Sequence, residues 1–150
     1  MNAIKPDSVF VIYIAAAPER LWQALTEPDL TEQYFFGRRI ELGDGVGGKF
    51  RLWMKDGRLD TSGEILEWEP PRRLFVSWHV EWLEEFRALP SARILFVIEP
   101  LGGMVRLTVS EFHPQPPNEK GLEGGRKGWP LILSSLKSLL ETGKALPMPG

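Results

Sequence analysis

The spacing of apolar residues changes along the chain, and each change marks a different kind of element. Residues 9–14 are β-branched or aromatic almost throughout, which predicts a strand with both faces partly covered. Pro18 suits the first turn of a helix, and the apolar residues after it are spaced as one helical face requires. Pro28 begins a second short helix, which Gly37 ends. The first quarter of the chain therefore predicts one strand and two short helices.

From Arg38 to Phe112 the apolar period is two, and Gly, Pro and Asp interrupt it, which predicts six antiparallel strands. Their expected ranges are Arg39–Leu42, Gly48–Met54, Leu59–Glu69, Leu74–Val80, Ser91–Glu99 and Met104–Phe112. Alternation gives four of them an inward apolar face: Phe50, Leu52 and Met54; Leu74, Val76 and Trp78; Ile94, Phe96 and Ile98; Val105, Leu107 and Val109. The facing of Leu59–Glu69 stays open, and Gly63 is a candidate for a bulge in it.

The C-terminal segment from Trp129 to Lys144 has the clearest helical pattern. Its apolar residues fall within an arc of about 120°: Trp129, Ile132, Leu133, Leu136, Leu139 and Leu140. Four glycines between residues 119 and 128, followed by Pro130, predict that the helix begins or kinks near Trp129. The glycine-rich segment before this helix is either a gate to a neighbouring cavity or a plain linker. A helix with one apolar stripe packs across a sheet with one apolar face, which gives the α+β class.

Composition narrows the function classes. A chain of 150 residues predicts a single domain over residues 1–150. The net charge of −2 gives no basic footprint for nucleic acid or an anionic membrane surface. There is no Cys and there are only two His, so we expect no metal and no cofactor. The N-terminal apolar run is too short to span a bilayer, so we expect a soluble, cytoplasmic protein.

Most of the short motifs have an ordinary structural explanation. Gly43 to Gly48 match G-x-G-x-x-G, but the next residues have the pattern of a strand rather than of a helix, so we expect a hairpin loop without a dinucleotide. His79 and His113 are expected on the surface. The same holds for three serines of the last helix, Ser134, Ser135 and Ser138, and for the basic pairs Arg38-Arg39, Arg72-Arg73 and Arg126-Lys127.

The inward aromatic residues allow two interpretations. Six large rings lie on elements that meet beneath the last helix: Tyr34, Phe35, Phe50, Trp78, Phe96 and Trp129. They either fill a core or line a ligand cavity. Glu111 is in phase with Val105, Leu107 and Val109 and should therefore point inward as the polar anchor of such a cavity. The alternative is a strand-end carboxylate that reaches water.

Four stretches carry a resemblance to a known family: IAAAPERLWQALTEPDLTEQYF, GVGGKFRLWM, EWEPPRRLFVSW and GWPLILSSLKSLLE. Together they resemble the activator of heat-shock-protein-90 ATPase family, C-terminal type, within the START-like (SRPBCC) helix-grip superfamily. The resemblance implies a curved antiparallel sheet that grips the last helix, with a cavity between them. Two positions depart from the family's pattern: Glu111 stands where the family has a His, and Leu95 and Val97 put an apolar strip on the outer face. That strip predicts a possible homodimer.

The resemblance favours binding of an apolar or amphipathic small molecule as the function. The residues expected to line the cavity are Tyr34, Phe35, Phe50, Leu52, Met54, Val76, Trp78, Phe96, Leu107, Val109, Glu111, Trp129, Leu133 and Leu136. One alternative is an enzyme of cyclase or dehydratase type that uses Glu111 as general acid or base. The other is a co-chaperone-like interaction module, a partnership that only the family name suggests. The catalytic residues of such an enzyme stay unknown.

Overall fold

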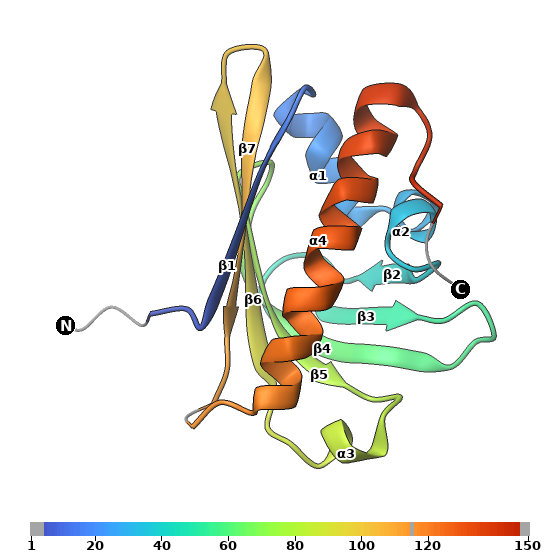
Figure 1. Cartoon of the computed structure of the whole chain (residues 1–150), viewed down its shortest axis with the longest axis vertical. Coiled ribbons are helices and arrows are strands. Elements are labelled where there is room, and N and C mark those ends of the chain that lie inside the picture. The colour runs from blue at the N-terminus through green and yellow to red at the C-terminus, as the bar shows by residue number, and fades with distance from the viewer. Residues whose placement is uncertain (1–4, 115, 148–150) are drawn as a thin grey trace.

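The computed structural model describes residues 5–114 and 116–147, which form a seven-stranded antiparallel sheet and four helices (Figure 1). The elements follow the order β1 (Ser8–Ile14), α1 (Pro18–Thr26), α2 (Pro28–Tyr34), β2 (Arg39–Leu42), β3 (Lys49–Trp53), β4 (Leu59–Glu69), β5 (Arg73–Val80), α3 (Glu84–Arg87), β6 (Ala92–Leu101), β7 (Met104–Phe112) and α4 (Glu119–Thr142). The strand order is β1-β7-β6-β5-β4-β3-β2. The sheet curves around α4, which confirms the α+β helix-grip class.

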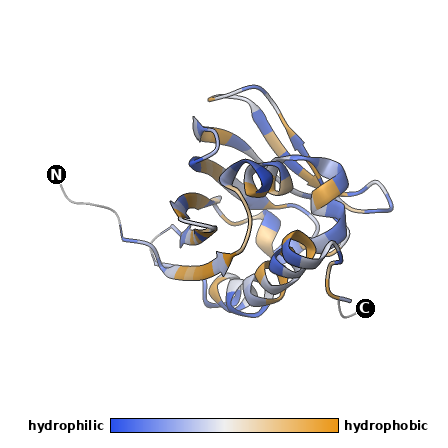
Figure 2. Cartoon of the chain, turned by 90° about the horizontal axis from the view of Figure 1, so that it is seen from above, coloured by the Kyte–Doolittle hydropathy of each residue, from blue (hydrophilic) through white to orange (hydrophobic). Residues whose placement is uncertain are grey.

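The alternating pattern correctly predicts which side of the sheet is buried. Apolar and polar residues alternate along the strands (Figure 2), and the inward members of β5, β6 and β7 form the core with the α4 stripe. In the β6–β7 pair, Phe96 lies opposite Val109 and Ile98 opposite Leu107. Met54 is an exception, since it follows the end of β3 and is only partly buried.

Strand β1 is covered on one face only, contrary to expectation. Val9 and Val11 are 52% and 50% exposed, whereas Phe10 and Ile12 pack against the core. The β-branched run therefore reflects strand propensity at the edge of the sheet rather than burial of both faces. This leaves an apolar outer surface beside β7.

Strand β4 contains its irregularity two residues beyond the predicted position. Its register against β5 shifts between Ile65 and Glu67, so Gly63 is not the bulge. Gly63 is needed for a different reason: a Cβ there would overlap the backbone carbonyl of Ser77 on β5. A second register shift, against β3, falls between Leu59 and Thr61. Ile65 faces the core, and the consecutive residues Asp60 and Thr61 are both buried.

Helix α4 begins ten residues before the predicted start, because Asn118 caps its first turn. The Asn118 side chain accepts a hydrogen bond from the Gly121 amide at 3.0 Å, and Pro130 lies inside the helix. The predicted stripe is buried from Trp129 to Leu139. Ser135 is buried as well, contrary to expectation, and its Oγ accepts a hydrogen bond from the Leu146 amide.

The glycine motif lies between two strands. Gly43 to Gly48 form the loop between β2 and β3, closed by a bond from the Gly48 amide to the Gly45 carbonyl, as the hairpin interpretation requires. Of the helices in the described part of the chain, none combines the length and apolar character needed to cross a membrane.

Candidate functional site

A cavity of about 380 Å³ lies at one end of the molecule, between the first half of α4, the adjoining ends of β5 to β7 and the β5–β6 connection that contains α3 (Figure 1, lower part). Its walls are mainly apolar and include Phe35, Trp78, Trp82, Leu83, Phe86, Leu89, Ile94, Trp129 and Ile132. Its polar groups include Arg38, Asp60, His79, Glu111, His113, Asn118 and Lys120. A mainly apolar wall with a few polar groups is typical of a small-molecule site.

The connection between β5 and β6 covers one side of the cavity and is held by two sets of contacts. His79 places Nδ1 at 2.8 Å from Glu81 Oε2 and Nε2 at 2.9 Å from the Arg87 carbonyl oxygen. Lys120 Nζ on α4 lies 3.1 Å from Glu85 Oε2 on α3. The second contact links the two walls of the cavity directly, from α3 to the start of α4.

The predicted aromatic residues divide into a cavity floor and a packed core. Trp129 meets Phe35 and Phe96 edge to face and Trp78 at a tilt, with ring centroids 5.7 to 5.9 Å apart. Such distances fill space, so the rings form a wall whose outer members meet the cavity. Of the fourteen residues predicted to line a cavity, Phe35, Trp78, Glu111 and Trp129 do so.

All the other predicted residues except Met54 lie in the core beneath that wall. Seven surround a void of about 20 Å³, which is large enough only for a water molecule: Tyr34, Phe50, Leu52, Val76, Phe96, Leu133 and Leu136. Met54, Leu107 and Val109 border neither space. Burial raises the pKa of the Tyr34 phenol, whose hydroxyl donates to the Ala24 carbonyl at 2.8 Å. The prediction therefore set the cavity too deep, because it assigned the core rings to it.

Glu111 points inward, as its position on β7 predicts, and it is 4% exposed. It lies opposite Ile94 in the β6–β7 register. Its Oε2 lies 3.2 Å from Nε2 of His113, whereas Oε1 is buried and has no hydrogen-bond partner among the described residues. A buried carboxylate oxygen without a donor is uncommon in proteins, because it loses its hydration without compensation. The residue borders the cavity, and Oε1 itself is packed against Gly125 of α4.

The glycines of α4 make room for this carboxylate and for the cavity. A Cβ on Gly125 would overlap the carboxylate of Glu111, so only glycine lets the helix pass so close to β7. Gly124 and Gly128 line the cavity, and a Cβ on either would meet nothing within 4 Å. The glycine-rich segment is therefore a shaped helical wall rather than an irregular approach.

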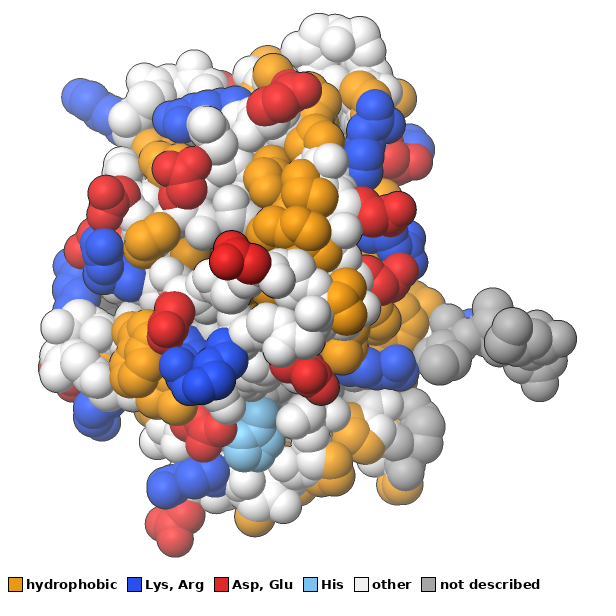
Figure 3. Space-filling model, turned by 180° about the vertical axis from the view of Figure 1, so that it is seen from behind, with side chains coloured by type: hydrophobic (Ala, Val, Ile, Leu, Met, Phe, Trp, Pro, Cys, Tyr) orange, Lys and Arg blue, Asp and Glu red, His pale blue; other side chains and the backbone are white. Residues whose placement is uncertain are grey.

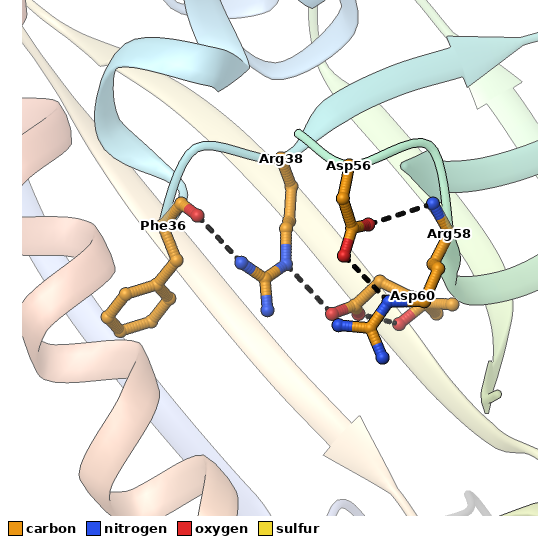
Figure 4. Close-up of polar contacts among 6 residues, drawn as sticks. Phe36, Arg38, Asp56, Arg58 and Asp60 are labelled. Carbon is orange, nitrogen blue, oxygen red and sulfur yellow. Dashed lines mark hydrogen bonds and ion pairs between the residues drawn. The ribbon is translucent and has the colours of Figure 1, made fainter. Parts of the chain in front are cut away.

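Arg38 lies at the cavity rather than in solvent, contrary to the surface interpretation of the arginine pairs. Its Nε donates to Asp60 Oδ2 at 2.8 Å and its Nη1 to the Phe36 carbonyl at 2.7 Å (Figure 4). The other Asp60 oxygen accepts from Thr61 Oγ1 at 2.6 Å. The sequence signal for this pair is weak: it consists of an Asp near the start of a strand and an Arg directly after a turn glycine.

The surface interpretation of the histidines is wrong for His113 and incomplete for His79. The His113 side chain is 11% exposed, and its amide donates to Asp7 Oδ2 at 2.7 Å. His79 is turned outward by alternation, but the connection around α3 folds over it and brings it to the cavity. Sequence alternation alone does not detect a cover that a neighbouring loop supplies.

Comparison with known proteins agrees with this architecture. The family model described as "Activator of Hsp90 ATPase homolog 1-like protein" matches residues 15–141. No protein of curated function matches the chain. Protein MLL2253 from Mesorhizobium loti is similar over 89% of this chain and 97% of its own, with 25% identity and a TM-score of 0.73.

Two further solved structures share the fold at lower identity. The Aha1 dimer from Colwellia psychrerythraea has 21% identity and a TM-score of 0.71, covering 91% of this chain and 97% of that one. CalU16 from Micromonospora echinospora has 24% identity and a TM-score of 0.70, covering 90% of this chain and 76% of that one. At these identities the likeness concerns the fold alone.

Proposed function

Because the chain belongs to the activator of Hsp90 ATPase homolog 1-like family and encloses an apolar cavity beside a buried carboxylate, we propose that it binds an apolar or amphipathic small molecule there. The ligand body would lie on Phe35, Trp78 and Trp129 beneath the α3 connection. Its hydrogen-bond donor would meet the Glu111 carboxylate. Burial of the ligand's apolar surface would provide most of the binding free energy.

The unpartnered oxygen of Glu111 is the observation that carries this proposal. A carboxylate in an apolar wall costs free energy unless a donor approaches it. His113 supplies one contact to Oε2, and Oε1 has no hydrogen-bond partner among the described residues. A ligand with a hydroxyl or amine group would satisfy it, which favours an amphipathic molecule over a purely apolar one.

N-Phenyl-2-naphthylamine tests the proposal, because it combines aromatic rings with one N–H donor and changes its fluorescence on binding. We expect saturable binding to the native protein. Gly128→Phe places a ring in the cavity from a helical position where a Cβ is unobstructed, so it should weaken binding by at least about tenfold, or about 1.4 kcal/mol.

Gly103→Phe is the matched control, since it adds the same ring in the β6–β7 turn, where a Cβ also meets nothing within 4 Å. It should leave the affinity unchanged. Equal affinities of the Gly128→Phe variant and the native protein would show that the probe binds elsewhere, and the cavity would lose its assigned role.

An enzyme of cyclase or dehydratase type is the second candidate, and the Glu111–His113 contact favours it. A carboxylate and an imidazole 3.2 Å apart can exchange a proton, which general acid–base chemistry in the same cavity would need. Interaction with a chaperone stays a third hypothesis, because only the family's description speaks for it.

A further inference from the structure

The cavity has a second polar group besides Glu111, the guanidinium of Arg38. Its side chain is 24% exposed, and two of its three nitrogens are bound within the protein, to Asp60 and to the Phe36 carbonyl. The third nitrogen, Nη2, points away from both partners in Figure 4. Arg38 therefore offers a donor that two internal hydrogen bonds hold in a fixed orientation.

The turn that carries Arg38 has an unusual backbone. Phe36 has φ of 49° and Gly37 has φ of 74°, so two consecutive residues adopt the left-handed conformation. Glycine tolerates this conformation, whereas an aromatic residue pays about 1 to 3 kcal/mol for it. The contact from Arg38 Nη1 to the Phe36 carbonyl depends on this turn. The strained residue thus contributes to holding the guanidinium at the cavity.

Arg38 and Glu111 mark two separate poles of one cavity. Asp60 on β4 holds Arg38, and Glu111 is on β7, with β5 and β6 between these strands. Three interstrand spacings amount to about 14 Å along the sheet. Trp78 on β5 belongs to the apolar wall of the same cavity. A molecule that uses both poles must therefore have polar groups at both ends of an apolar body.

We propose that Arg38 is the anchor for an acceptor or anionic group of the ligand, such as a carboxylate, and that the ligand is an aromatic or cyclic acid with a donor at its other end. This inference rests on the proposed function and specifies its ligand class. The Glu111 carboxylate repels an anion, so the anionic end lies at Arg38 and the donor end at Glu111. The two poles together fix the orientation of the bound ligand in the cavity.

Two fluorescent probes that differ by one group test this assignment. 6-Anilinonaphthalene-2-sulfonate is N-phenyl-2-naphthylamine with a sulfonate added at the far end of the naphthalene ring, so its anion and its N–H donor lie at opposite ends of an apolar body. We expect Arg38→Met to weaken binding of the sulfonate probe about tenfold, by loss of a charge-assisted bond. Binding of the neutral probe should change less than about twofold. Arg58→Met is the control, because Arg58 pairs with Asp56 in an exposed turn and does not line the cavity.

Removal of Arg38 alone leaves the Asp60 carboxylate without its cation, so the double variant Arg38→Met/Asp60→Asn is measured as well. It should show the same selective loss with the neutral probe retained. Arg38→Lys keeps the positive charge but loses the planar guanidinium group and its paired N–H donors. It should give an intermediate loss of affinity for the sulfonate probe.

Three outcomes overturn the inference. An unchanged ratio of the two affinities in the double variant would show that Arg38 contacts no anion. Equal weakening of both probes in the double and Lys variants would make Arg38 a purely structural residue. Failure of the native protein to bind the neutral probe would overturn the proposed function, and this inference with it.

Discussion

Glu111 and Arg38 show how much a single residue's surroundings determine its role. The alternation of residues along β7 correctly predicts that Glu111 points inward. Arg38 follows a left-handed turn outside any periodic segment, so the sequence does not indicate which way its side chain points. The adjacent residues Arg38 and Arg39 therefore resemble ordinary surface arginines. The inward position of Arg38 arises from Asp60, twenty-two residues away in the chain. Contacts of this kind depend on tertiary structure, and local patterning does not encode them.

Substitution of Glu111 separates its roles as anchor and as acid or base. Glu111→Gln keeps the shape but replaces a charged acceptor by a neutral one, so N-phenyl-2-naphthylamine should bind about 1 kcal/mol more weakly. The melting temperature should stay equal or rise, because a poorly compensated buried charge is removed. Titration calorimetry and thermal melts measure the two effects.

Glu64→Gln is the control for that change, because Glu64 is an exposed carboxylate on β4. If Glu111→Gln binds the probe as tightly as the native protein, Glu111 is no anchor. If a substrate is found, loss of turnover with binding retained would assign Glu111 to acid–base chemistry instead.

At the scale of elements, the strands follow from the sequence and the cavity walls do not. Leu59–Glu69 and Met104–Phe112 coincide with β4 and β7, although alternation assigns an inward face only to the second of them. The start of α4 departs from prediction because glycines and Pro130 lower helix propensity, while the Asn118 cap and the fit of Gly125 against Glu111 compensate. Helix α3, at four residues, is too short for any periodicity.

The β5–β6 connection should loosen as pH rises. Both nitrogens of His79 face acceptors, the Glu81 carboxylate and the Arg87 carbonyl, and only the imidazolium has two N–H groups to donate. The hydrogen bond with Glu81 raises the pKa of His79 above 6.5, against the opposing effect of burial. Hydrogen bonds from Ser62 and His79 lower the pKa of Glu81, which keeps it ionised.

Because the folded-state pKa of His79 is raised, its contribution is complete below the unfolded value and is lost as pH passes the folded value. We expect protection of the hydrogen-bonded amides of Phe86, Arg87 and Leu89 against hydrogen exchange, corrected for intrinsic rates, to fall above about pH 6.5. His79→Gln should abolish this dependence, and His113→Gln should preserve it. A pH-independent protection in the native protein would contradict the assignment.

At the scale of the whole molecule, the outer face of the sheet carries apolar residues that no element of the described chain covers. Outward apolar residues stand on β1 and β6: Val9 and Leu95 flank Ser110 of β7, and Val11 and Val97 flank Thr108. Seen from behind, apolar side chains gather in a band between charged ones (Figure 3). An exposed apolar surface of this kind is typical of an interface.

We expect a second copy of the chain on this face. The double change Leu95→Thr/Val97→Glu should shift a dimer towards monomer in sedimentation equilibrium, because it adds a charge to an apolar contact. Exchange of Ser134 and Ser138 on the far side of α4 for Thr and Glu serves as control and should leave the assembly unchanged. A native protein that is monomeric at high concentration would refute the homodimer.

The position of Pro130 has a kinetic consequence for any bound molecule. Proline has no N–H, so the Arg126 carbonyl lacks the usual helical donor, and α4 is divided there into a cavity-lining half and a core half. Before Trp129 only Leu122 is buried, whereas the second half carries most of the stripe. The first half can therefore open while the core stays packed, at a free energy below that of global unfolding. The residence time of a ligand would then depend on this half-helix, and mutations that stabilise the core would leave it unchanged.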